Sequence, residues 1–179
     1  MFEVELRGLM NEAKFKSLTQ ELESLPSAND DKLTVFFAYD SGIFKVVERK
    51  YDGEVKLSLK LGDETRNSLE EHEVRLKPGS LEDTVKVLEH IGYRIKSRVT
   101  QKRTNYTLED SIELSLKHTE DWGYHFEIEK LVSSRSKVDD AKQQLQDVLG
   151  TLGLKPMTES ELSAFLEQIE AKSRPRPTA

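Results

Sequence analysis

The residues best suited to chemistry in this sequence are charged side chains at every second position. Glu3, Glu5 and Arg7 are separated by apolar residues, so in an extended chain their side chains share one face. Four more segments repeat this spacing: Lys56, Ser58 and Lys60; Glu71, Glu73 and Arg75; Glu113, Ser115 and Lys117; and Glu127 with Glu129. Carboxylate oxygens suit Mg²⁺ and Mn²⁺, and Arg and Lys bind phosphate. Together, such faces would support phosphoryl chemistry on a bound polyanion.

The elements that must position these groups are strands, because apolar and polar residues alternate with a period of two. We predict eight strands, over residues 2–7, 33–40, 43–51, 54–61, 69–77, 93–107, 110–118 and 123–132. The Asp52-Gly53 pair predicts a tight hairpin turn, because Gly tolerates a positive φ.

Apolar residues at helical spacing predict four helices, over 12–25, 81–91, 136–149 and from 158 to 169. We expect Asn11 to cap the first helix, and Ser80 and Thr158 to begin the second and fourth as capping-box residues. Gly150 is expected to end the third helix. Residues 171–179 are expected to form a flexible tail.

A closed sheet can bury the apolar faces of these strands and also bring their charged faces together. If helices cover the apolar faces, the charged faces can line an enclosed space. We therefore predict an α+β fold, an eight-stranded, mainly antiparallel tunnel barrel with a charged lumen and flanking helices, as a single domain over residues 1–170. If the first and last strands are neighbours, Glu3 and Glu5 lie near Glu127 and Glu129 and can converge on a hard cation.

The composition excludes several other classes of protein. The 179 residues contain no Cys, which rules out disulfide scaffolds, thiolate zinc sites and a Cys nucleophile. The sequence has no long apolar run, so we expect no membrane association and a cytoplasmic location. With 33 acidic and 27 basic residues the net charge is -6, which argues against binding to duplex nucleic acid.

Four short motifs occur in an order that resembles the CYTH family, also called triphosphate tunnel metalloenzymes. Residues 3–7 (EVELR) are similar to the family's opening Glu-x-Glu-x-Lys, and residues 57–60 (LSLK) to its Leu-Thr-x-Lys strand. Residues 103–106 (RTNY) look like its Arg-x-x-Tyr element, and residues 123–129 (GYHFEIE) like its closing Gly-x-x-x-Glu-x-Glu run. The resemblance spans nearly the whole chain.

This resemblance implies a tunnel that acts on a small-molecule triphosphate with Mg²⁺ or Mn²⁺. It implies that the triphosphate is bound by Arg7, Lys45, Lys60, Arg75 and Arg103. It implies that the metal is bound by Glu3, Glu5, Glu127 and Glu129, with Glu3 and Glu5 as the catalytic residues. The expected reaction is hydrolysis of inorganic tripolyphosphate, thiamine triphosphate or a nucleoside triphosphate.

Three departures from the family pattern keep other functions open. Val47 and Gln101 stand where relatives usually have an Arg and a Lys, and Lys117 stands where they usually have a metal-binding Asp. One alternative is a catalytically weakened module that only binds polyphosphate, a nucleotide or an RNA 5′ triphosphate. The other is a class IV adenylate cyclase, which makes cyclic AMP from ATP. The sequence also leaves open whether the protein forms a homodimer.

Overall fold

The computed structural model describes residues 2–62 and 68–173. Its strands are β1 (Phe2–Leu9), β2 (Ser27–Asn29), β3 (Lys32–Phe37), β4 (Gly42–Arg49), β5 (Val55–Leu61), β6 (Ser68–Leu76), β7 (Ile95–Thr107), β8 (Ile112–Thr119) and β9 (Gly123–Val132). Its α-helices are α1 (Glu12–Glu21), α2 (Leu81–His90), α3 (Val138–Thr151) and α4 (Glu159–Ser173). None of the helices in the described residues is long and apolar enough to span a membrane.

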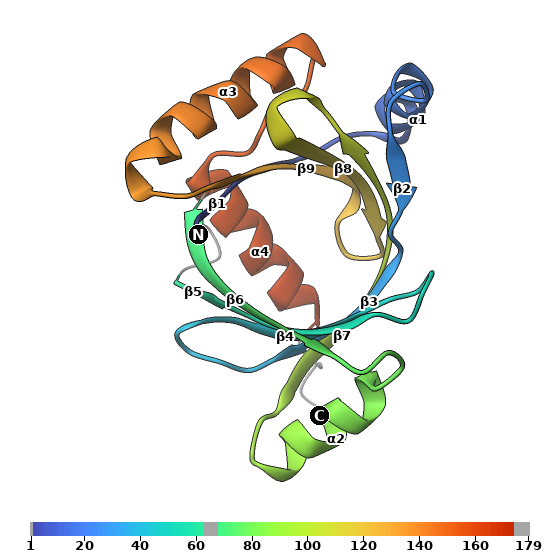
Figure 1. Cartoon of the computed structure of the whole chain (residues 1–179), viewed down its shortest axis with the longest axis vertical. Coiled ribbons are helices and arrows are strands. Elements are labelled where there is room, and N and C mark those ends of the chain that lie inside the picture. The colour runs from blue at the N-terminus through green and yellow to red at the C-terminus, as the bar shows by residue number, and fades with distance from the viewer. Residues whose placement is uncertain (1, 63–67, 174–179) are drawn as a thin grey trace.

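Eight of the strands form a closed barrel, which Figure 1 shows as a ring of ribbons. The strand order is β7-β3-β4-β5-β6-β1-β9-β8, and pairing of β8 with β7 closes the ring. Every described pairing is antiparallel, so the predicted α+β tunnel barrel with flanking helices is confirmed.

The prediction of only eight strands is incomplete, because β2 adds a ninth. This strand pairs with β7 from Tyr106 to Thr104, beyond the residues of β7 that pair with β3. Three residues are too few to show a period-two pattern, and all three are exposed, so the sequence carried no signal for this strand.

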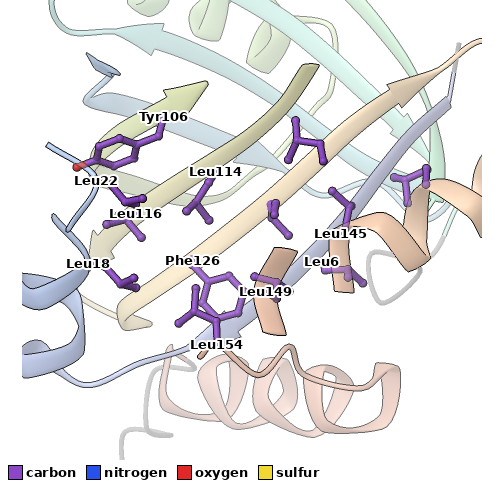
Figure 2. Packing of buried hydrophobic residues seen from close by; sticks show 14 of the residues in the cluster. Leu6, Leu18, Leu22, Tyr106, Leu114, Leu116, Phe126, Leu145, Leu149 and Leu154 are labelled. Atoms are coloured by element: carbon purple, nitrogen blue, oxygen red, sulfur yellow. The ribbon is translucent and has the colours of Figure 1, made fainter. Parts of the chain in front are cut away.

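The hydrophobic core lies outside the barrel, between the strands and the helices. Leu6 of β1 and Phe126 of β9 point outward and lie beside Leu145 and Leu149 of α3 (Figure 2). Val4 of β1 belongs to the same buried cluster. A second cluster fills the space between β3, β4 and β5 and the helix α2. Because side chains alternate across a strand, burying the apolar face outward leaves the polar face inside.

Two of the predicted helix starts are confirmed. The Asn11 side chain accepts a hydrogen bond from the backbone N–H of Lys14 at 2.8 Å. At α4, the Glu161 N–H donates to Thr158 Oγ1 and the Thr158 N–H donates to Glu161 Oε2, which is a capping box.

Other predicted helix ends differ from the structure. The Ser80 hydroxyl donates back to the Lys77 carbonyl at 2.6 Å, so it does not cap α2. The first helix ends at Glu21 rather than at 25. Helix α3 runs through Gly150, and Gly153, with a φ of 63°, adopts the left-handed conformation after it. Helix α4 includes residues 171–173 of the predicted tail, whereas 174–179 lie outside the described residues.

Candidate active site

The inward faces of the strands line a cavity of about 1050 Å³. Pockets that bind small molecules usually measure about 300–1,000 Å³, so this space suffices for a triphosphate. Carboxylates and cationic side chains line it in nearly equal numbers, a lining that the alternation had predicted. In Figure 1, α4 lies across the opening of the ring, and its Leu166 and Ile169 add an apolar part to the lining.

An acidic wall of four glutamates is formed by the neighbouring strands β1 and β9. Glu5 lies directly opposite Glu129 in the register, and Arg7 lies opposite Glu127. Glu3, Glu5, Glu127 and Glu129 all line the cavity. The pairing of the first strand with the last strand therefore brings the four predicted metal ligands to one side of the lumen.

Cations from the same cavity contact three of these glutamates. Arg7 Nη2 lies 2.8 Å from Glu5 Oε2, Lys60 forms an ion pair with Glu3, and Lys117 forms one with Glu127. Burial opposes the charge of Glu5, but Arg7 and Lys60 outweigh it and hold the pKa of that carboxyl well below its usual range. Burial also opposes the charge of Lys60, and Glu5 and Glu3 outweigh it and raise the pKa of its ammonium.

Glu129 is the member of this wall without an ion-pair partner within the described part of the chain. Burial, together with the negative charges of Glu3 and Glu5, raises the pKa of Glu129 to about 7. Its charge at neutral pH is therefore poorly compensated. A cation placed among Glu3, Glu5 and Glu129 would remove this repulsion.

Three of the four glutamates of the acidic wall have surroundings that suit a divalent metal. In residues 2–62 and 68–173, no three acidic or imidazole groups already converge as a ready-made metal site. Glu3, Glu5 and Glu129 nevertheless have the carboxylate oxygens that Mg²⁺ or Mn²⁺ prefers, and those of Glu3 and Glu5 would become available if Lys60 and Arg7 moved to an anion. Glu127 does not fit this set in the same way, because Lys117 occupies it.

Lys45 lies on β4, which β5 and β6 separate from β1, and it reaches into the cavity. Burial and the charge of Lys60 lower the pKa of Lys45 to about 8. It has no ion-pair partner among the described residues. This ammonium therefore remains available to an incoming anion.

A second group of charges surrounds Arg103 and Asp30. Asp30 Oδ2 lies 2.7 Å from Lys32 Nζ and accepts a hydrogen bond from Asn105 at 3.0 Å, and Arg103 Nε lies 3.8 Å away. Arg103 Nη2 also contacts Glu113 at 2.9 Å. Asp30 Oδ1 is buried without a hydrogen-bond partner in the described residues. Asp30 thus orients two cations that face the cavity.

The structure brings four of the five predicted phosphate-binding residues to the cavity, namely Arg7, Lys45, Lys60 and Arg103. It does not bring the fifth. The Arg75 side chain is 76% exposed, lies outside the cavity lining and contacts Glu54 at 3.3 Å, because it stands near the end of β6. Arg49, Val47 and Gln101 line the cavity, and the Arg49 guanidinium is held by Asp52 and Glu54.

Three polar residues of the cavity were not among the predicted site residues, namely Asp30, Lys32 and Asn105. Asn105 shares the parity of Arg103 on β7, and this spacing could have indicated it. Lys32 begins β3, one residue before the predicted strand. Asp30 lies between two strands, where no alternation could show its direction.

The comparisons with known proteins agree with this architecture. The sequence matches the CYTH domain family over residues 1–162. No curated protein matches it. One similar structure is the PH1012 protein from Pyrococcus horikoshii, which is 22% identical with a TM-score of 0.74, covering 86% of this chain and 91% of that one.

Two further similar structures carry functional descriptions. A candidate adenylate cyclase from Vibrio parahaemolyticus is 16% identical, with a TM-score of 0.70 over 93% of this chain and 98% of that one. The Hippeastrum protein HpAC1, described as having a dominant triphosphatase activity, is 19% identical, with a TM-score of 0.62 over 93% and 95%. At these identities the likeness shows the fold.

Proposed function

The chain belongs to the CYTH domain family, and from that membership and the charges inside its barrel we propose that it is a metal-dependent hydrolase of a triphosphate. The observation that carries the proposal is the meeting of two opposite groups in one enclosed cavity. Arg7, Lys45, Lys60 and Arg103 suit a polyphosphate chain, and Glu3, Glu5 and Glu129 suit a divalent cation.

The ion pairs of the acidic wall would couple the binding of the two ligands. When Lys60 and Arg7 move to phosphate oxygens, they leave the carboxylates of Glu3 and Glu5 without partners. A hard divalent cation bound there would draw off the negative charge that builds up as a phosphorus–oxygen bond breaks. Triphosphate binding would therefore raise the affinity for metal, and metal binding would raise the affinity for triphosphate.

The chain's own residues would also orient the reaction. Lys45 reaches the cavity from β4, across from the acidic wall on β1 and β9, and Arg103 reaches it from β7, which is separated from β9 by β8. Cations on both sides can fix the phosphate chain so that water attacks the terminal phosphorus in line with the leaving group. The expected products from tripolyphosphate are phosphate and pyrophosphate.

A binding module is the second candidate, and one contact favours it. Lys117 holds Glu127, a predicted metal ligand, in an ion pair. If this contact prevents a metal from binding productively, the tunnel would hold a triphosphate without turning it over. The class IV adenylate cyclase activity is distinguished from both by its products.

The experiment offers the protein tripolyphosphate, thiamine triphosphate or ATP with Mg²⁺ or Mn²⁺, and measures phosphate, pyrophosphate and cyclic AMP separately. Phosphate release that stops in excess chelator supports the hydrolase. Pyrophosphate with cyclic AMP indicates the cyclase, and binding without product indicates the module. Lys60→Met should abolish binding, whereas Lys86→Met, which removes an exposed lysine on α2, should leave it unchanged.

A further inference from the structure

Lys117 is the most enclosed cation of the cavity that contacts the acidic wall. Its side chain is 3% exposed, compared with 10% for Lys60 and 15% for Arg7. It extends from β8 to Glu127 on β9, which is diagonal to it because Lys117 pairs with His125 in the register. Long side chains on such diagonal positions can meet.

The surroundings of Lys117 keep it at this position. Lys117 lies opposite Arg103 on its other neighbouring strand, so a second cation limits any movement in that direction. Glu5 and Glu129 face it from β1 and β9 and attract its charge, although burial and Arg103 lower the pKa of the ammonium.

Lys60 and Arg7 differ from Lys117 in what happens when an anion binds. Both are more exposed to the cavity, and both can exchange a carboxylate for a phosphate oxygen. Lys117 is almost fully enclosed, so we expect its contact with Glu127 to persist. Three carboxylates are then free for a metal, those of Glu3, Glu5 and Glu129.

From this geometry we propose that Lys117 is a built-in cation of the acidic wall, which occupies Glu127 and limits the tunnel to one divalent ion per chain. The proposal rests on the proposed function, since it assigns the metal to the same wall. It makes Lys117 a positioning residue that sets metal stoichiometry, and it makes Glu3, Glu5 and Glu129 the complete carboxylate set.

Metal counting tests this proposal without an activity assay. Free Mn²⁺ is measured by electron paramagnetic resonance while Mn²⁺ is titrated into the full-length protein in saturating inorganic sulfate, a weak Mn²⁺ ligand that can occupy Lys60 and Arg7 in place of a triphosphate. We expect one bound Mn²⁺ per chain for the wild type and two for Lys117→Asp, with affinity at least about tenfold tighter because a positive charge beside the ions becomes negative. Lys117→Gln should also bind two ions, because it frees Glu127.

Lys56→Gln is the matched control, because Lys56 lies in the same cavity and contacts Glu73 at 2.9 Å. It also frees a carboxylate, but away from the acidic wall, and it should still bind one ion.

Thermal melts establish that each variant is folded. Two ions in the wild type, no ion in the wild type, or a single ion in a folded Lys117→Gln or Lys117→Asp would overturn the proposal. If neither substitution folds, the wild-type count decides it. Tripolyphosphate binding by the wild type separates the two proposals: binding together with two Mn²⁺ ions contradicts only the role of Lys117, whereas absence of both ligands contradicts the proposed function.

Discussion

At the scale of single residues, the acidic wall is not uniform. Glu3, Glu5 and Glu127 each contact a cation, whereas Glu129 has no ion-pair partner among the described residues and lies near the charges of Glu3 and Glu5. Like charges in a partly buried site repel one another and reduce the stability of the folded state. In the absence of ligands, Glu129 is therefore the carboxylate of the acidic wall whose negative charge is least compensated.

This difference predicts a pH-dependent effect of Glu129→Gln. The pKa of Glu129 is raised to about 7 from an ordinary value of 4.5, so the folded state binds the extra proton between these pH values. The wild type should therefore lose stability as pH rises from 5 to 7. In chelator at pH 8, Glu129→Gln should be more stable than the wild type by about 1–3 kcal/mol, and the gain should disappear near pH 5. Urea unfolding at both pH values measures this difference.

Glu127→Gln is the control for this experiment, because it removes a carboxylate that already has a cationic partner. It should be destabilised at both pH values, since Lys117 would lose its buried partner. If Glu129→Gln increased the free energy of unfolding equally at pH 5 and pH 8, the charge of Glu129 would not be the source of the repulsion.

Lys45 predicts a second pH dependence, in binding. Its pKa is lowered to about 8, so the free protein loses this charge between pH 7 and pH 9. The wild type should bind tripolyphosphate up to about tenfold more weakly at pH 9 than a Lys45→Arg variant whose affinity matches it at pH 7, because Arg remains charged. Isothermal titration calorimetry measures the affinity of both proteins for tripolyphosphate at each pH. The protonation of tripolyphosphate itself affects both proteins equally, so it cancels in the ratio of their affinities. A constant ratio of affinities would show that Lys45 does not contact the anion.

At the scale of elements, the segment between α3 and α4 packs closely against β1. The Met157 N–H donates to the Arg7 carbonyl at 2.9 Å. A Cβ added at Gly8 would lie 2.6 Å from the Lys155 carbonyl oxygen and 2.7 Å from the Phe126 ring. Glycine at this position lets the segment approach the strand that carries half of the acidic wall.

Gly8→Ala should therefore destabilise the protein by about 1–3 kcal/mol, as expected for overpacking. Gly150→Ala is the matched control, since a Cβ there meets nothing within 4 Å and Gly150 lies inside α3. That substitution should stabilise the protein by about 0.5–1 kcal/mol. Urea denaturation of both variants tests the prediction, and an unchanged Gly8→Ala midpoint would contradict the close packing.

At the scale of the whole molecule, the fold places its charges in two environments. Cations and carboxylates are nearly balanced inside the cavity, while the chain carries a net charge of -6. The outer surface therefore carries most of the excess negative charge. This distribution suits a small anion that enters the barrel and disfavours a large anion that must bind outside it.

Tripolyphosphate with Mg²⁺ should consequently stabilise the folded protein, by about 2.7 kcal/mol at 100 times its dissociation constant. Duplex DNA should neither raise the melting temperature nor reduce the shift that tripolyphosphate causes, because phosphates on a rigid duplex cannot reach Lys60 or Arg103. Thermal melts with each ligand and with both measure this. A shift with duplex DNA that weakens as salt increases would contradict the prediction.

The sequence by itself determined which side chains face the lumen. Alternation is a local property, because successive side chains of a strand point to opposite faces whatever the strand pairs with. Glu3, Glu5, Lys60 and Glu129 could therefore be assigned to one polar face before the fold was known. The apolar residues between them required helices outside the barrel, and this requirement led to the closed α+β architecture.

Only the tertiary structure decided which of those side chains meet. Contacts between distant segments depend on register and on barrel closure, which the pairing of β8 with β7 sets over a long sequence separation. Alternation could not show that Lys117 reaches Glu127, because this contact joins two strands, or that Asp30 contacts Lys32, because Asp30 lies outside the strands. It also could not show that Arg75 is exposed and does not line the cavity, since side chains near the end of a strand can lie beyond the enclosed space.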